Sequence, residues 1–313
     1  MIRILVLHYS QTGQLTRAVK SLLSPLANRP DVEIVWQNLE PVEPFPFPWG
    51  FFRFFDTFPE CVHLDPPPIR PVAFGPAARF DLVVLSYQVW FLSPSLPVTA
   101  FLKSEAARVL RDTPVITFIA CRNMWLSAQE KMKGLLRDLG ARLVDNVVLV
   151  DQGPPWATFI TTPRWVLTGK KNGFWGIFPP AGVSAAEIAA AARFGRALAD
   201  ALPLLQSAQG PLLSGLGAVK VIPGYITGEK IAHRSFRLWG KLLRAIGKPG
   251  NPLRRLVLVV YIVFLVAMIL TVMPLSIIMR ALLRPLLRKR LEAEVARLEA
   301  PSGSSTERLA QYS

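Results

Sequence analysis

Short apolar runs alternate with segments of helical periodicity along residues 1–205. The run at 2–9 is rich in Ile, Val and Leu, which is typical of a strand buried on both faces, and further runs predict strands at 32–39, 81–86, 114–120 and 142–150. Apolar positions at helical spacing lie between and after them, at 14–27, 97–103, 126–139 and 185–202. The last helix follows Ser184, with Glu187 at the capping-box position. This alternation predicts an α/β fold with a doubly wound, five-stranded parallel sheet.

Two insertions rich in proline and aromatic residues interrupt the alternation. Residues 41–79 contain ten prolines, and eight aromatic side chains fall within 45–58. Residues 151–183 add five prolines and six Phe or Trp side chains. Segments this apolar are not expected to be disordered, and long loops in compact domains are often functional. The insertions predict either a satellite core over the sheet or segments that wall an apolar pocket or contact lipid.

The charge is concentrated at the C-terminal end. The chain has 36 basic and 21 acidic side chains, and residues 211–313 alone hold 16 basic against 5 acidic. Such a basic segment indicates binding to nucleic acid or to an anionic membrane. Residues 256–279 are 24 residues without a formal charge, and about 20 apolar residues suffice to cross a bilayer core. We therefore expect an anionic membrane surface as partner, and no nucleic acid.

The membrane segment leaves two topologies open. Residues 228–248 predict a basic amphipathic helix with Trp239 at the interface. Six basic residues lie within about 20 positions on each side of the apolar run, so the positive-inside rule gives no orientation. A single span is preferred, and a hairpin kinked near Pro274 on one leaflet is the alternative. Without a signal peptide at the start, the catalytic domain is expected on the cytoplasmic side of the cytoplasmic membrane.

These patterns divide the chain into four parts. The predicted parts are a folded domain at 1–205 that includes both insertions, a basic amphipathic linker at 206–250, a membrane-attaching helical segment at 251–300 and a disordered tail at 301–313.

The turn from the first strand into the first helix predicts an anion site. It consists of Ser10, Gln11, Thr12, Gly13, Gln14, Leu15 and Thr16. Its hydroxyls, its glycine and the backbone N–H groups of the helix start suit a phosphate group. It has no lysine and no Gly-x-Gly-x-x-Gly pattern, which excludes a nucleoside-triphosphate loop and a dinucleotide fingerprint.

Two further loops should meet this turn, because ligands bind beyond the carboxyl ends of the strands in such a sheet. After the third strand come Tyr87, Gln88, Val89, Trp90 and Phe91, and after the fourth come Cys121, Arg122, Asn123 and Trp125. Two cysteines exclude a disulfide framework, and the three scattered histidines have no metal-ligand spacing, so no metal is expected. No residue is assigned as catalytic.

These loops resemble those of flavodoxin-like proteins. Residues 10–16 are similar to the FMN-phosphate loop, Ser/Thr-x-Thr-Gly-x-Thr, with Leu15 at the last position and Thr16 one step later. Residues 87–97 resemble the isoalloxazine loop of flavodoxin-like NAD(P)H:quinone and FMN reductases, with Tyr87 in place of the usual proline. The resemblance covers residues 1–205. It implies sheet order 2-1-3-4-5, FMN held by all three loops and an FMN-dependent oxidoreductase with NAD(P)H as candidate electron donor.

Nearly the whole chain also resembles flavodoxin-like proteins labelled dialkylresorcinol condensing enzyme. The stretches that carry this resemblance are YSQTGQLTR, PFPW…FFDTFPE, LSYQVWFLSPSLPVTAFL and ACRNMW…AQEK. It implies biosynthesis of alkylated aromatic lipids with partner enzymes, and a lipophilic quinone- or resorcinol-type substrate. Condensing enzymes of that pathway type use a nucleophilic Cys with His and Asn on a duplicated fold, which this chain lacks. The resemblance therefore favours a redox or aromatising role. The alternatives are a flavodoxin-like electron-transfer protein and, because of Leu15, a flavin-free scaffold of a membrane complex.

Overall fold

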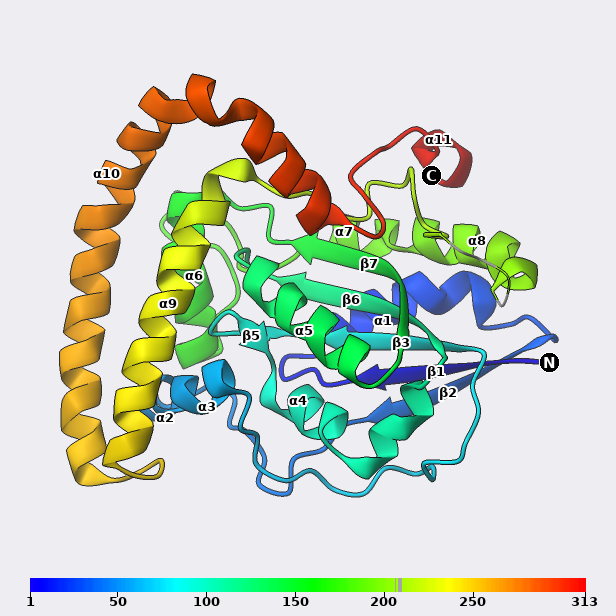
Figure 1. Cartoon of the computed structure of the whole chain (residues 1–313), viewed down its shortest axis with the longest axis horizontal. Helices are drawn as coiled ribbons and strands as arrows, with labels where there is room; N and C mark the ends of the chain where they lie inside the picture. The colour runs from blue at the N-terminus through cyan, green and yellow to red at the C-terminus, as the bar shows by residue number, and fades with distance from the viewer. Residues whose placement is uncertain (206, 208–209) are drawn as a thin grey trace.

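A five-stranded parallel sheet forms the centre of the computed structural model, which describes residues 1–205, 207 and 210–313, with the side chains of 272–288 excepted (Figure 1). Its strands are β1 (Ile2–His8), β2 (Val32–Asn38), β3 (Leu82–Tyr87), β6 (Pro114–Cys121) and β7 (Arg142–Val150). They are arranged in the order β2-β1-β3-β6-β7. Counting only these strands, the order is 2-1-3-4-5, that of a flavodoxin-like sheet. The predicted fold class is confirmed.

Helices cover both faces of the sheet. One face carries α1 (Gln14–Leu23), α7 (Ala185–Ala190) and α8 (Ala192–Ala201), and the other carries α4 (Leu96–Leu102) and α5 (Leu126–Asp138). Short 3-10 turns lie at Ser24–Leu26, Glu105–Leu110 and Leu202–Leu204. The Ser184 hydroxyl accepts a hydrogen bond from the Glu187 N–H at 3.1 Å, as the capping-box pattern predicts. A Cβ on Gly195 would lie 1.8 Å from the Leu22 carbonyl oxygen, so glycine permits the close approach of α8 to α1.

The insertions contain three helices and a small hairpin follows β3. Residues 41–79 form α2 (Phe51–Asp56) and α3 (Phe58–His63), residues 151–183 form α6 (Pro155–Thr168), and β4 (Val89–Trp90) pairs antiparallel with β5 (Ser93–Pro94). A second apolar cluster joins the first insertion to the C-terminal helices through Phe58, Val62, Leu243, Leu258 and Tyr261. The first insertion therefore builds a satellite core.

Two long helices lie beside this satellite core. They are α9 (Pro223–Ile246), which packs on α3 and α5, and α10 (Pro252–Glu299), whose first half runs antiparallel to α9 (Figure 1). Arg254 near the start of α10 pairs with Asp56 and Glu60, while Arg297 near its end pairs with Glu130 of α5 at 2.5 Å. Both ends of α10 thus contact the same α/β domain. The kink predicted near Pro274 lies outside the described side chains.

The C-terminal residues complete the core, and the prediction of a disordered tail at 301–313 is wrong. Asp145 on β7 is fully buried and accepts hydrogen bonds from the N–H groups of Leu212 and Leu213 and from the Ser302 hydroxyl, at 2.7–3.2 Å. The chain ends in α11 (Leu309–Tyr312), packed against α8. A buried carboxyl group needs such donors, which ties these segments to β7. Residues 206–250 are likewise no simple linker, because 211–222 join the core and α9 follows.

Candidate functional site

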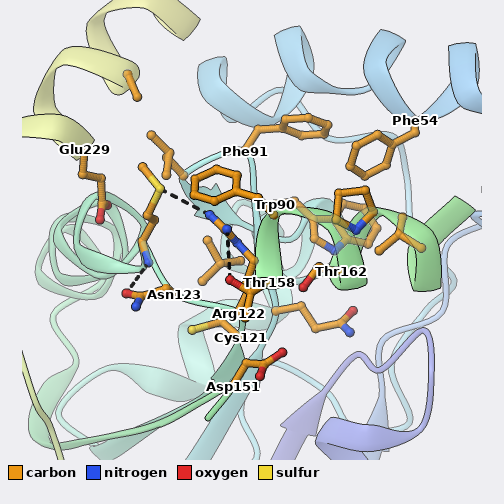
Figure 2. A pocket seen from close by; sticks show the side chains of 18 of the residues that line it. Phe54, Trp90, Phe91, Cys121, Arg122, Asn123, Asp151, Thr158, Thr162 and Glu229 are labelled. Carbon is orange, nitrogen blue, oxygen red and sulfur yellow. Dashed lines mark hydrogen bonds between the residues drawn. The ribbon is translucent and has the colours of Figure 1, made fainter. Parts of the chain in front are cut away.

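A cavity of about 530 Å³ lies beyond the carboxyl ends of the sheet strands. The segments after β1 and β3 contribute Gln11 and Gln88 to its lining. The end of β6 contributes Cys121 and the segment after β7 contributes Asp151 (Figure 2). The first insertion, α6, α9 and α10 form the remaining walls. The position follows from the fold, because the chain runs from β1 to α1 on one face of the sheet and from β3 to α4 on the other, which opens a crevice between the two loops.

The turn after β1 is only partly exposed to the cavity. Gly13 is the N-cap of α1 with φ of 73°, a left-handed conformation that favours glycine. Gln11, Thr12 and Gln14 line the cavity, whereas Leu15 is buried in the main core. The predicted contacts Ser10, Gly13 and Thr16 are not among the lining residues.

Several buried polar atoms of the turn after β1, of α1 and of α6 lack a hydrogen-bond partner within the described chain. They are Ser10 Oγ, Gln14 Oε1, Thr161 Oγ1 and Thr162 Oγ1, the last two from α6. Buried polar atoms in proteins are nearly always hydrogen-bonded, so these atoms indicate a missing polar ligand. Two basic side chains lie near this turn. The Arg17 guanidinium would be 3.4 Å from a Cβ on Gly13, and burial together with the Arg17 charge lowers the pKa of Lys171. The unpaired hydroxyls, the helix start and these cations fit a phosphate group.

Gly182 lines the cavity next to Gln14 of α1 and Trp165 of α6. A Cβ at this position would lie 2.4 Å from Gln14 Oε1 and 2.8 Å from Trp165 Cζ3. Its N–H donates to Asp151 Oδ2 at 2.6 Å, and its φ is 85°. Glycine is therefore required here on both steric and conformational grounds.

The loop after β3 presents aromatic rings to the cavity. Phe91 and Leu92 have φ of 47° and 58°, which is unusual for bulky residues and recurs at functional sites. Trp90 packs edge-on against Trp49 at 5.5 Å between ring centroids, and Phe91 lies 4.9 Å from Phe54. The first insertion and this loop thus form one aromatic wall.

Gln88, Val89, Trp90 and Phe91 line the cavity as predicted contacts, but Tyr87 does not. Tyr87 is fully buried in the core, where its hydroxyl donates to Gln129 Oε1 at 2.7 Å. It is the last residue of β3, so its side chain belongs to the packing between the sheet and α5 rather than to the loop.

Arg122 brings a positive charge to the cavity without an anionic partner. Its guanidinium contacts Thr158 Oγ1 at 3.4 Å and Met124 Sδ at 3.6 Å and lies 4.2 Å from the Phe159 ring centroid (Figure 2). Within the described part of the chain it forms no ion pair, and burial lowers its pKa. An unpaired buried charge is costly, so this guanidinium indicates an anionic or strongly polar ligand group.

The other predicted residues after β6 divide between cavity and core. Cys121 and Asn123 line the cavity, whereas Trp125 is buried in the core as the N-cap residue of α5. Burial raises the pKa of the Cys121 thiol, which stays protonated at neutral pH. A neutral thiol is a poor nucleophile, so the geometry does not support covalent chemistry at this residue.

Sequence reasoning missed the part of the lining supplied by α9 and α10. These helices contribute Tyr225, Glu229, Phe236, Tyr261, Phe264, Leu265, Met268 and Ile269. Their periodicity predicts amphipathic or membrane helices but gives no register against the domain. The signal that could have indicated this part of the site was Glu229, the only acidic residue in the sequence of segment 211–291.

Comparisons with known proteins return only distant structural likenesses. No protein-family model and no curated protein matches the chain. A flavoprotein in complex with FMN from Lactobacillus acidophilus NCFM is 16% identical over 47% of this chain and 93% of that chain, with a TM-score of 0.37. A WrbA-like flavodoxin from Agrobacterium tumefaciens is 9% identical over 65% and 99%, also with a TM-score of 0.37. At these scores the fold assignment rests on the strand order, and the resemblance to dialkylresorcinol proteins gains no support.

Proposed function

We propose that this protein is a membrane-attached, FMN-dependent oxidoreductase acting on a lipophilic cyclic substrate. The observation that carries the proposal is the cavity beyond the strand ends, which combines unpaired polar atoms at the start of α1 with the unpaired guanidinium of Arg122. Bound FMN supplies hydride transfer. Thr12 and Thr162, which line the cavity, would hold its phosphate, with Arg17 and Lys171 balancing the charge.

The loops after β3 and β6 would hold the flavin ring. Trp90 and Phe91 offer flat apolar contacts on one side, and Arg122 offers a fixed positive charge for the polar edge of the ring. A cation near that edge favours a reduced, more negative flavin. The aromatic wall and the buried Gln14 exclude water from the site.

A lipophilic substrate is supported by the side of the cavity away from the phosphate site. There the walls are Phe54, Phe55, Phe236, Tyr261, Phe264 and Met268. An unpaired ion in such surroundings costs several kcal/mol, so highly charged substrates are excluded. A planar ring with an alkyl tail, of the quinone or resorcinol type, matches both the aromatic walls and a membrane reservoir.

Attachment to one membrane leaflet is supported by α9 and α10. The segment Pro252–Thr271 has a mean hydropathy of 2.5, long and apolar enough to cross a membrane by length and composition. Leu256, Val263 and Leu270 on α10 and Leu238 on α9 are at least 64% exposed. Because both ends of α10 are fixed to the same domain, we favour the one-leaflet alternative over a single span, on the cytoplasmic side with basic residues toward anionic lipid.

An electron carrier is the other candidate class, and turnover separates the two. The full-length protein in detergent is supplied with NADH or NADPH and with quinones of increasing alkyl length. The proposal predicts that kcat/KM rises with tail length and that charged, water-soluble acceptors react poorly. Equal kcat/KM for all tails would show that the apolar walls do not select the substrate. Reduction only through a second protein would favour the carrier.

A further inference from the structure

Glu229 places a carboxyl group in the cavity wall, far from the three predicted loops in sequence. It lies on α9, is 1% exposed and belongs to the cavity lining (Figure 2). Its Oε1 accepts a hydrogen bond from the Ser127 N–H at 2.5 Å, at the start of α5. Its Oε2 is buried and has no hydrogen-bond partner among the described residues. The Ser127 hydroxyl and the Leu126 N–H at the start of α5 also lower the pKa of this carboxyl. The start of α5 therefore holds the group, and Oε2 is the atom left for a ligand.

The surroundings of Glu229 favour its neutral form. Burial raises the pKa of this carboxyl, and the hydrogen bonds from the start of α5 oppose that rise only in part. No cation is paired with it within the described chain. The charged and titratable groups on the elements around it are Tyr87 of β3, Cys121 and Arg122 at the end of β6, Asp151 after β7, Lys131 of α5, and Tyr225 and His233 of α9.

Few of these neighbours change charge between pH 5 and 9. Burial, together with the Glu229 charge, raises the pKa of Tyr87 and of Cys121, which therefore stay neutral. Burial lowers the pKa of His233 to about 4, below this range. Burial lowers the pKa of Lys131 to about 8, so Lys131 titrates within it and must be separated by a variant.

We propose that Glu229 is the polar anchor of a ring ligand in the cavity, with Oε2 as the contacting atom. As an acid, Oε2–H donates to the carbonyl oxygen of a neutral cyclic ketone or quinone. As a carboxylate, Oε2 accepts from the hydroxyl of the corresponding phenol. Oε1 keeps its bond to Ser127 in both forms, so the side chain need not move. This inference rests on the proposed function and specifies the substrate group that meets the protein.

The proposal can be tested by the pH dependence of ligand binding, without measuring turnover. A pentyl-substituted cyclohexenone and the matching pentylphenol share ring size and tail, and neither titrates between pH 5 and 9, because a phenol has a pKa of about 10. Isothermal titration calorimetry on the full-length protein in detergent should show opposite trends. The ketone should bind more weakly as pH rises through the pKa of Glu229, and the phenol should bind more tightly. Identical or flat profiles for both ligands would overturn the proposal.

The Glu229→Gln variant separates the effect of Glu229 titration on ligand binding from the effect of Lys131 titration and from general effects of pH. The amide oxygen still accepts from Ser127, and its NH₂ group can only donate. We expect ketone binding without the Glu229-dependent change with pH, and phenol affinity reduced about tenfold, the loss of one hydrogen bond. Glu105→Gln, at an exposed carboxylate that pairs with Arg108, should behave as wild type. If Glu229→Gln keeps the wild-type profiles, the proposal is wrong.

Flavin absorbance of the same samples distinguishes a failure of the Glu229 proposal from a failure of the proposed function. Flavin with flat binding profiles would remove the role of Glu229 and leave the proposed function. Opposite profiles in a protein that takes up no FMN would keep the ligand site and remove the oxidoreductase. Should Glu229→Gln fail to fold, judged by thermal unfolding, Lys131→Met decides the matter, because it removes the other group that titrates in this range. Opposite trends that persist in Lys131→Met support Glu229, and their loss overturns the proposal.

Discussion

Replacing Arg254 by Met should release the start of α10 from the domain. The side chain is 1% exposed, and its guanidinium makes a bidentate pair with Glu60 at 2.7 and 2.9 Å and a further bond to Asp56 Oδ1 at 2.7 Å. It also donates to the carbonyl oxygens of Asp56 and Gly247. The Arg254→Met variant leaves two carboxylates and two carbonyl groups without this partner.

The magnitude follows from the burial of the network. Removing one partner of a buried ion pair costs about 3–5 kcal/mol. Asp56 and Glu60 keep side-chain exposures of 14% and 16%, so water partly solvates them after the change and we expect about 3 kcal/mol. At about 1.4 kcal/mol per factor of ten, the start of α10 should open at least a hundredfold more often.

Hydrogen exchange of the α2 and α10 amides in detergent-solubilised protein measures this opening. Arg255→Met is the matched control, because Arg255 is the exposed neighbour whose main contact is the Phe52 ring at 4.0 Å, worth about 0.5–1 kcal/mol. Amides near Arg254 should exchange at least a hundredfold faster in Arg254→Met and no more than about fivefold faster in the control. Equal effects of the two substitutions would refute the claim that the ion network fixes α10.

Two further predictions concern the C-terminal segments. Asp145→Ala should lower the free energy of unfolding by about 3 kcal/mol, because the buried N–H groups of Leu212 and Leu213 lose their acceptor. In the same chemical denaturation, Asp138→Ala at an exposed site should change the free energy of unfolding by less than about 0.5 kcal/mol. In sealed vesicles with the domain outside, tags at both chain termini should be removed by added protease if α10 lies on one leaflet; protection of the C-terminal tag alone would support a single span.

The α/β domain could be predicted because each of its strands and helices has a local signal. The runs that become β3 and β6 are continuously apolar, as buried parallel strands are, and Ser184 with Glu187 marks a helix start. Their order in the sheet follows from connection rules and from the family resemblance. The turn at Gly13 was predictable for the same reason, since a strand, a glycine and a helix follow one another directly.

The C-terminal third was harder to predict because its contacts are distant in sequence. Asp145 gains its donors from residues 67 to 157 positions away, and nothing in its strand indicates them. The apolar pattern of α10 is the same for a span and for a helix lying against a domain, and the sequence does not indicate the ion-pair partners of Arg254 and Arg297 in the domain. Tyr87 and Trp125 were predicted at the site because they adjoin the loops. The side-chain alternation of β3 directs Tyr87 into the core, and Trp125 packs in the core as the N-cap residue of α5.

An absorbance spectrum of the purified full-length protein, followed by FMN titration, tests the central claim most directly. The account predicts a flavin spectrum, with FMN rather than FAD released on denaturation. Gly182→Ala should lose most of the flavin, because the added methyl group meets Gln14 and Trp165, whereas Gly75→Ala, where a Cβ meets nothing within 4 Å, should retain it. A wild-type protein that stays colourless at saturating FMN, or equal occupancy in both variants, would contradict the assignment of this cavity to a flavin.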